Sequence, residues 1–243
     1  MEVYENRIGF RFVTYKYITL NSISYQDDIV YNIKSKCLYI SDSTRRCIWL
    51  MTTTGEPQLT EWLTTLTRIC TISLSNEGHL LVLRESQTII MEVYSLNATL
   101  IRTLNLPQDV KDPRHVVQTS AGNFVILHRL SNALSGKFAI TQLTSDGQLI
   151  HRFLSRNQSE ELSDPRHLSL DPENNLLFVA DYGNNRVVLL DSNVLTWKKV
   201  LLSQKADGIH DPFRLFYDTS KKHLFVAQQM HRQHSNVSVY KLN

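Results

Sequence analysis

The chain has 243 residues, of which 42% are apolar and 20% are charged, values that are ordinary for a soluble globular protein. Its 26 Lys and Arg residues against 23 Asp and Glu residues give a net charge of +3, too small to indicate nucleic-acid binding unless the basic residues cluster. The three cysteines are odd in number and lack Cys-x-x-Cys spacing, which argues against a disulfide framework and favours a reducing compartment.

The N-terminal region contains no signal-peptide core, because charged residues such as Glu5, Arg7 and Arg11 interrupt its apolar residues. No apolar run reaches the roughly 18 residues that span a bilayer. We therefore expect a cytoplasmic or other intracellular protein with no membrane partner. Residues 8–20 read instead as a β-strand, because β-branched and aromatic residues dominate them.

Short apolar runs separated by turn residues follow in five copies along the chain. Residues Asn32–Asp42 in the first copy align without gaps on residues Asp171–Asp181 in the fourth. The predicted copies occupy about residues 23–65, 66–109, 110–161, 162–208 and 209–243, the last together with residues 1–22.

The fourth copy is the clearest unit. Asp171-Pro172 opens a turn, because proline presets the backbone angle of the second turn position, and Asn174 and Asn175 tolerate a positive angle. Apolar runs flank this turn and a second turn at residues 182–185. The pattern predicts four short strands in about 40 residues.

Four-stranded units that recur every 40 to 50 residues or so, with no helical periodicity between them, predict a β-propeller. The strands read as nearly continuous apolar runs, which is typical of sheets covered on both faces. We predict a single all-β propeller domain of residues 1–243 with five four-stranded blades, six blades being the alternative. Residues 8–20 are predicted to complete the last blade and close the ring.

The fourth copy resembles the NHL repeat. It has Asp-Pro-Arg-His at residues 164–167, an apolar strand that ends in Asp181, and Asn185-Arg186 before a β-branched strand. The other copies share the period: Asp42 is kept in the first, whereas Arg84, His128 and Gln228 replace Asp in the second, third and fifth. The resemblance implies a propeller, usually of six blades, that binds RNA or protein. Related propellers include a peptide-amidating lyase and calcium-dependent lactonases, so the fold alone leaves an enzyme open.

Asp-Pro followed closely by a basic residue recurs at Asp112, Asp164 and Asp211, and the three arginines are spaced by 52 and 48 residues. Loops that enter each first strand, and loops that join second and third strands, open on the same face of a propeller. The predicted binding face consists of Arg46, Arg84, Arg114, His115, Arg166, His167, Tyr182, Asn185, Arg186, Arg214 and Arg232. One hypothesis is a basic docking surface for an acidic peptide or a phosphate backbone. The other, which we favour, is that repeated Asp–Arg pairs lock loops and neighbouring blades together.

Signals for catalysis and metal binding are weak. His231 and His234 have ligand-like spacing, and His115 and His167 occupy equivalent positions, but a metal site needs three or four converging ligands. No nucleophile elbow, Cys–His pair or glycine-rich phosphate loop is evident. We therefore predict no catalytic residue, no metal and no cofactor.

The predicted function is a non-catalytic scaffold that binds a protein or peptide partner through one loop face. RNA binding on the same face is the alternative, for which Tyr182 is the one loop aromatic placed for base stacking. A metal-dependent lyase or lactonase is the third interpretation. The sequence leaves the oligomeric state open.

Overall fold

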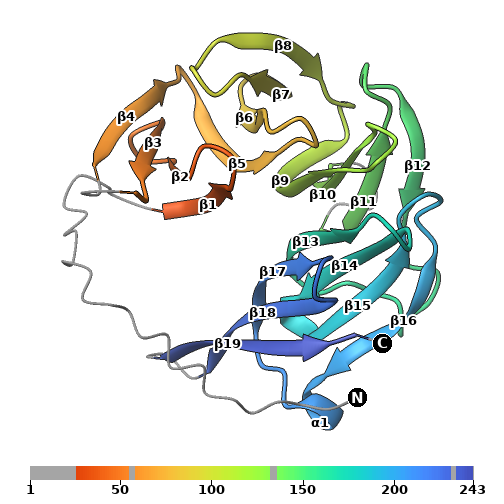
Figure 1. The fold of residues 1–243 in the computed structure, drawn as a ribbon. Coiled ribbons are helices and arrows are strands. Elements are labelled where there is room, and N and C mark those ends of the chain that lie inside the picture. Colours follow the sequence, from red (N-terminus) through yellow and green to blue (C-terminus); the bar gives the residue numbers. More distant parts are fainter. Residues whose placement is uncertain (1–25, 55–57, 132–135, 231–233, 243) are drawn as a thin grey trace. The chain divides into compact units, whose positions relative to one another are not determined.

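The computed structural model describes residues 26–54, 58–131, 136–230 and 234–242. These residues form five antiparallel sheets, one short α-helix, α1 (Gln204–Asp207), and a single 3-10 turn, η1 (Tyr182–Asn184). The protein is therefore all-β, and its sheets are the five blades of a β-propeller fold (Figure 1), which confirms the predicted fold class. Described residues up to Thr103 form one compact unit, and residues from Leu104 onwards form another.

The first unit contains two sheets. Their strands, in spatial order, are β1 (Gln26–Asn32), β2 (Cys37–Asp42), β3 (Cys47–Thr52) and β4 (Leu59–Thr64), and then β5 (Arg68–Leu74), β6 (Leu80–Glu85), β7 (Ile89–Tyr94) and β8 (Leu100–Asn105). A hydrophobic core lies between the two sheets, with Tyr39 and Ile48 packed against Ile72 and Val82. The aromatic ring of Trp62 meets that of Tyr39 edge to face, with ring centroids 5.1 Å apart.

The second unit contains three sheets. Their strands are β9 (Val110–Gln118), β10 (Phe124–Leu130), β11 (Phe138–Leu143) and β12 (Leu149–Phe153); β13 (Pro165–Asp171), β14 (Leu176–Asp181), β15 (Arg186–Asp191) and β16 (Trp197–Ser203); and β17 (Pro212–Asp218), β18 (His223–Met230) and β19 (His234–Lys241). Strand β13 lies beside β9 on one side and β17 on the other, so each sheet presents its first strand to the next sheet's first strand.

The middle sheet of this unit is buried on both faces. Along β14, Leu177 and Val179 belong to the core shared with the β9–β12 sheet, whereas Phe178 and Ala180 belong to the core shared with the β17–β19 sheet. All four side chains are fully buried. Both faces being covered explains why the strands read as continuous apolar runs instead of an alternating pattern.

The predicted turn of the fourth copy forms as expected. The Asp171 carboxylate oxygen Oδ1 accepts hydrogen bonds from the backbone N–H groups of Glu173 and Asn174 at 3.1 and 3.3 Å. Asn175 then adopts the left-handed conformation, with φ of 53°. In the first copy Asn32 takes the place of Asp171, and its Oδ1 accepts from the N–H of Lys34 at 2.9 Å.

The last sheet has three strands within the described residues, whereas the other four sheets have four. The predicted strand at residues 8–20 lies outside the described residues, so its pairing with the last sheet stays a prediction. No helix in the described part of the chain is long and apolar enough to cross a membrane.

Candidate functional site

The Asp-Pro corners begin with a left-handed residue. Asp112, Asp164 and Asp211 have φ angles of 42°, 49° and 44°, and short polar side chains tolerate this region better than most. In β13 the strand register then shifts between Pro165 and His167, and this bulge aims the intervening side chain away from the ladder. In β13 the corner therefore sets the direction of Arg166, whereas in β17 the corresponding residue is Phe213 and Arg214 lies in the ladder opposite Ala227.

Two of the corner arginines, Arg114 and Arg166, are paired with carboxylates. Arg114 Nη2 lies 2.9 Å from Asp112 Oδ2 in its own corner and 3.7 Å from Asp164 Oδ1 in the next. Arg166 forms a hydrogen-bonded ion pair with the same Asp164. Asp164 is thus shared by the arginines of two consecutive sheets, an arrangement that supports the favoured interpretation of these pairs as links between blades.

A second pair, Asp181 and Arg186, holds the loop between β12 and β13. Arg186 Nε lies 2.7 Å from Asp181 Oδ2, and its two terminal nitrogens donate to the backbone carbonyls of Ser159 and Glu161, both at 2.8 Å. Asp181 Oδ1 accepts from the N–H of Ser163 at 2.7 Å. Burial raises the pKa of Asp181, and hydrogen bonds from Asn184 and Arg186 oppose that rise.

The residues that replace Asp181 in other repeats also form hydrogen bonds through their side chains. Gln228 Oε1 accepts from the N–H of His210 at 2.8 Å, which reproduces the contact of Asp181 with Ser163. The amide of Gln228 also donates to Ser238 Oγ at 2.8 Å. In the third repeat His128 Nε2 lies 2.8 Å from Thr141 Oγ1. In each of these repeats, the residue at the position of Asp181 is a buried polar residue. A side chain on the third strand of the same sheet forms a hydrogen bond with it.

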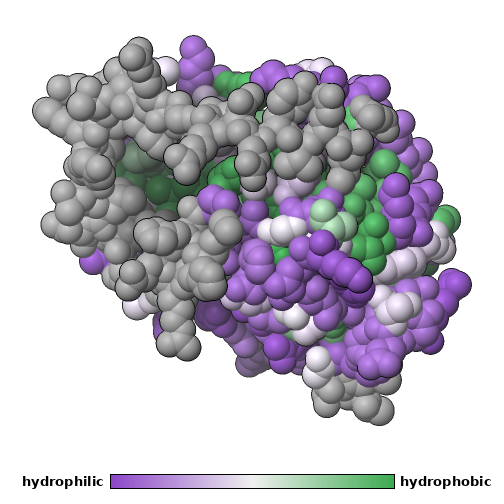
Figure 2. Space-filling model, turned by 90° about the horizontal axis from the view of Figure 1, so that it is seen from below, coloured by the Kyte–Doolittle hydropathy of each residue, from purple (hydrophilic) through white to green (hydrophobic). Residues whose placement is uncertain are grey.

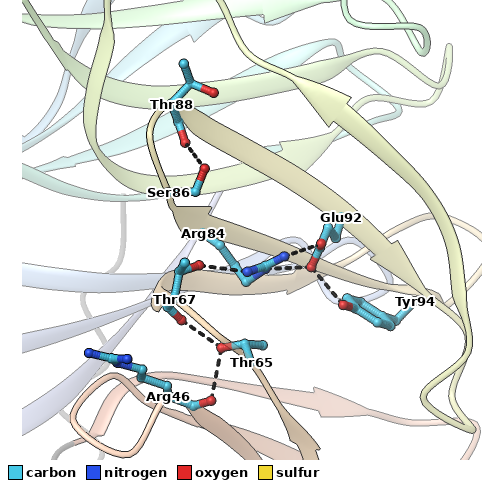
Figure 3. Close-up of polar contacts among 8 residues, drawn as sticks. All are labelled: Arg46, Thr65, Thr67, Arg84, Ser86, Thr88, Glu92 and Tyr94. Carbon is cyan, nitrogen blue, oxygen red and sulfur yellow. Dashed lines mark hydrogen bonds and ion pairs between the residues drawn. The ribbon is translucent and has the colours of Figure 1, made fainter.

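The second repeat carries the largest of these substitutions. Arg84 points into its sheet between Glu92 and Thr67, as Figure 3 shows. Its Nε lies 2.6 Å from Glu92 Oε2, its Nη1 donates to Thr67 Oγ1 at 2.7 Å, and the Tyr94 hydroxyl donates to Glu92 at 2.7 Å. The side chain of Arg84 is 13% exposed, so it supports the blade and offers little to a ligand.

His115 and His167 lie between innermost strands instead of on an open face. Their rings stack with centroids 3.7 Å apart, and His115 is only 5% exposed. The Nδ1 atom of His115 accepts from the N–H of Leu168, and that of His167 accepts from the N–H of Leu215, both at 3.4 Å. Burial lowers the pKa of His167 well below its usual value, and the nearby His115 and Arg214 lower it further. These two histidines therefore tie consecutive sheets together.

The remaining predicted residues are scattered. Arg46 is exposed in the first unit and donates to the Leu66 carbonyl at 3.3 Å. In the second unit Tyr182 lies under the Arg166 guanidinium, 5.0 Å from ring centroid to Cζ, and Asn185 Oδ1 accepts from the N–H of Asp211 at 2.7 Å. Arg214 is partly buried, and Arg232 lies outside the described residues.

A groove of about 510 Å³ adjoins the Asp164 corner in the second unit. It is formed by the loops between β10 and β11, between β12 and β13, and between β14 and β15. The lining residues are Arg129, Gly136, Lys137, Phe138, Ser155, Gln158, Glu161, Leu162, Ser163, Asp164 and Asn184. None of the eleven predicted binding residues lines it. The signal that could have indicated it is the unusual length of the first two loops, since long loops in compact domains are often functional.

The groove contains the more accessible cations of this loop face. The side chains of Arg129 and Lys137 are 41% and 52% exposed, compared with 39% for Arg166, 22% for Arg114 and 14% for Arg186. The Arg129 guanidinium lies over the ring of Phe138, 4.7 Å from its centroid, with Nε 3.4 Å from Asp112 Oδ2. Lys137 Nζ lies 3.8 Å from Glu161 Oε1, a distance that permits exchange for another acceptor.

Metal ligands do not gather in the described residues, where no group of three or more His, Cys, Asp or Glu side chains is placed to hold an ion. The described part of this loop face carries ion pairs, amide and hydroxyl groups, and the rings of Phe138 and Tyr182, each beneath an arginine. Such groups can hold a polypeptide by charge and hydrogen bonding.

No protein-family model matches the chain, and no curated protein matches its sequence. Solved structures match its fold. A nidogen/laminin complex has 20% identity, over 84% of this chain and 72% of that chain, with a TM-score of 0.63. A gluconolactonase from Xanthomonas campestris has 11% identity over 90% of this chain and 73% of that chain, with a TM-score of 0.63. The calcium-binding protein regucalcin from Agrobacterium tumefaciens has 12% identity over 85% of this chain and 68% of that chain, with a TM-score of 0.62. At these identities the similarity concerns the fold alone.

Proposed function

We propose that the chain is a non-catalytic interaction module that binds a protein or peptide partner in the groove beside the Asp164 corner. The observation that carries this proposal is the composition of the groove. It combines two accessible cations, Arg129 and Lys137, with the carboxylates of Glu161 and Asp164, and the buried ring of Phe138 supports Arg129 from below. Side chains of both charges suit an extended polypeptide, whose side chains vary in charge and whose backbone both donates and accepts hydrogen bonds.

The pairing of the corner arginines favours a polypeptide over RNA. A phosphate backbone binds through cations that can exchange their counterions for phosphates. Arg114, Arg166 and Arg186 each lie 2.9 Å or less from a carboxylate of this chain, closer than Arg129 and Lys137 at 3.4 and 3.8 Å, so fewer of the cations on this face can exchange their partner for a phosphate. One face of the Tyr182 ring is covered by Arg166, which leaves less of it for base stacking.

The fold similarities agree with this proposal without defining a partner. The nidogen/laminin structure is a complex between proteins on a similar fold. The gluconolactonase shares the fold at 11% identity, and we base no catalytic proposal on it. A lyase or lactonase activity would need a constellation of converging groups in addition to the fold.

The proposal is tested with peptides selected from a random display library on the wild-type protein. The dissociation constant of the best peptide is then measured by fluorescence anisotropy for wild type, for Arg129→Glu/Lys137→Glu, and for the charge-matched control Lys199→Glu/Lys205→Glu. Both control lysines lie on the same unit, and Lys205 and Lys199 are exposed. We expect the groove variant to weaken binding by about tenfold or more and the control to leave it unchanged, since charged contacts at an interface contribute on this scale.

Equal binding by all three proteins would contradict the proposal. A single-stranded RNA oligomer serves as the second probe in the same assay. Binding of that RNA with a steep dependence on salt, lost in the groove variant, would replace the proposed function by its alternative.

A further inference from the structure

The charged residues beside the groove form a connected chain of ion pairs. Hydrophilic residues do not by themselves mark a site, since they are widespread on the face that Figure 2 shows, where they are purple. The ion pairs differ from such scattered charges because they link two sheets of the second unit. Arg166 is paired with Asp164, and Arg114 contacts both Asp164 and Asp112. Arg129 contacts Asp112 and ends the chain.

The two carboxylates of this chain are shared unequally. Asp112 Oδ2 lies 2.9 Å from Arg114 Nη2 but 3.4 Å from Arg129 Nε. Asp164 forms a hydrogen bond with Arg166, whereas its Oδ1 lies 3.7 Å from Arg114 Nη2. Three guanidinium groups thus share two carboxylates, which leaves one positive charge in excess. Because Arg129 ends the chain and has the longer contact with Asp112, the excess charge is concentrated at Arg129.

The neighbouring charges do not remove this excess. Lys137 and Glu161 line the same groove, but they are paired with each other at 3.8 Å and together add no net charge. Lys111 lies opposite Arg129 in the ladder between β9 and β10 and is exposed, so it adds a further positive charge. Exposed charges more than about 8 Å away are largely screened at physiological salt. The groove beside Arg129 is therefore electropositive.

The side chain of Arg129 is placed to contact a ligand. It lines the groove and is 41% exposed. Its guanidinium lies over the ring of Phe138, 4.7 Å from the centroid, and this contact restricts the directions in which the side chain can move. A guanidinium held in one orientation presents its N–H donors in a fixed geometry that matches the two oxygens of a carboxylate.

We propose that the peptide partner presents the carboxylate of an Asp or Glu side chain to Arg129, and that Arg129 determines the specificity of the groove. This inference rests on the proposed function, because it requires a polypeptide in the groove. A carboxylate suits the site better than a phosphate does. Glu161 and Asp164 also line the groove, and they would repel a dianionic phosphate about twice as strongly as a monoanionic carboxylate.

A double-mutant cycle between protein and peptide tests this proposal. The probe is the highest-affinity peptide selected from the random library on the wild-type protein, and each of its Asp or Glu residues is replaced in turn by Asn or Gln. Dissociation constants are measured by fluorescence anisotropy for wild type, for Arg129→Gln and for the control Arg156→Gln. Arg156 is an exposed arginine on the loop between β12 and β13 and is not among the lining residues of the groove.

One acidic position of the peptide should depend on Arg129. At that position we expect the amide peptide to bind wild type and Arg156→Gln about tenfold more weakly than the parent peptide does. The same replacement should change binding to Arg129→Gln by less than about twofold, because the partner of the carboxylate is already absent.

Three results would overturn this inference and leave the proposed function intact. The first is a selected peptide without Asp or Glu whose binding is lost in Arg129→Glu/Lys137→Glu. The second is an acidic peptide in which every amide replacement affects wild type and Arg129→Gln equally. The third is a peptide with phosphoserine at the acidic position that binds more than about tenfold more tightly than the parent, which would assign Arg129 to a phosphate. Failure of the proposed function itself gives a different result, since the selected peptide would then bind Arg129→Glu/Lys137→Glu as tightly as wild type.

Discussion

Arg84 and Glu92 form a two-point ion pair inside the β5–β8 sheet, with Arg84 Nε 2.6 Å from Glu92 Oε2 and a second contact between Nη2 and Oε1. The two side chains are 13% and 6% exposed. The Tyr94 hydroxyl donates to the same carboxylate, and burial raises the pKa of Tyr94, which keeps it a donor. The Glu92 pair raises the pKa of Arg84. The charges are therefore balanced within the sheet.

Removal of one partner should be costly. We expect Glu92→Leu to lower the free energy of unfolding by about 3–5 kcal/mol, because it leaves the Arg84 charge buried without a counter-charge. The double variant Arg84→Met/Glu92→Leu should recover most of the loss, since a well-packed apolar pair replaces the ion pair. Urea unfolding measures all three proteins.

The exposed pair Arg68–Glu85, with side chains 56% and 54% exposed, provides the control for that prediction. Glu85→Leu should change the free energy of unfolding by less than about 1 kcal/mol. If Glu92→Leu costs no more than Glu85→Leu, the pair does not stabilise the sheet in the way described.

The free energy of unfolding should decrease as the pH is lowered, because the fold buries His128 in its neutral form. Burial lowers the pKa of His128 to about 4, from 6.5 in the unfolded chain. The folded form therefore holds His128 neutral, while the unfolded form takes up a proton below about pH 6.5. Its contribution is fully present above that pH and is lost as pH falls towards 4, by a total of about 3 kcal/mol.

The contribution of His128 is isolated by comparison with His128→Gln, whose amide does not titrate. Free energies of unfolding are measured for both proteins from pH 7 to pH 4. The difference between wild type and variant should change by about 3 kcal/mol over this range, to the disadvantage of wild type at low pH. Parallel curves would show that His128 is not held neutral by burial.

Gly183 approaches the backbone of the groove loop closely. A Cβ atom at this position would lie 2.5 Å from Ser163 Oγ and 2.6 Å from the Ser163 carbonyl oxygen, to which the Gly183 N–H donates at 2.7 Å. Gly183→Ala should therefore cost about 3 kcal/mol, because the backbone must move and that hydrogen bond is strained.

Gly122→Ala is the comparison for Gly183→Ala. Gly122 has φ of +83° and nothing within 4 Å of an added Cβ, so only its backbone conformation is penalised, by about 1 kcal/mol. Thermal unfolding of the two variants shows which substitution lowers the melting temperature more. A Gly183→Ala protein as stable as Gly122→Ala would mean that the Ser163 loop yields easily.

The architecture could be predicted from sequence because its signals are local. The Asp171-Pro172 turn and the repeated Asp-Pro corners depend on residues next to one another, and the structure forms the turn as expected. The gap-free alignment of residues 32–42 on residues 171–181 likewise identifies equivalent strands. The count of five follows from that period.

The candidate site was less accessible to sequence reasoning, because its contacts join residues that are distant in the chain. Their equivalent positions in two repeats predict His115 and His167 on a binding face, whereas in the structure their rings stack between strands 52 residues apart in the chain. In the sequence Arg84 stands where the fourth repeat has Asp181, and nothing nearby in the sequence indicates its partner. The register of β6 on β7 brings Glu92 beside it. The groove depends on three loops meeting, which no single segment encodes.

A footprint of a bound peptide tests the central claim most directly. Hydrogen–deuterium exchange of the full chain is compared with and without a saturating, library-selected peptide. We predict slower exchange in the loops that join β10 to β11, β12 to β13 and β14 to β15, and no change in the turns at residues 119–123 and 171–175, at the opposite ends of the strands. Protection confined to those opposite turns, or saturable binding that leaves the three loops unchanged, would contradict the assignment of the groove as the partner site.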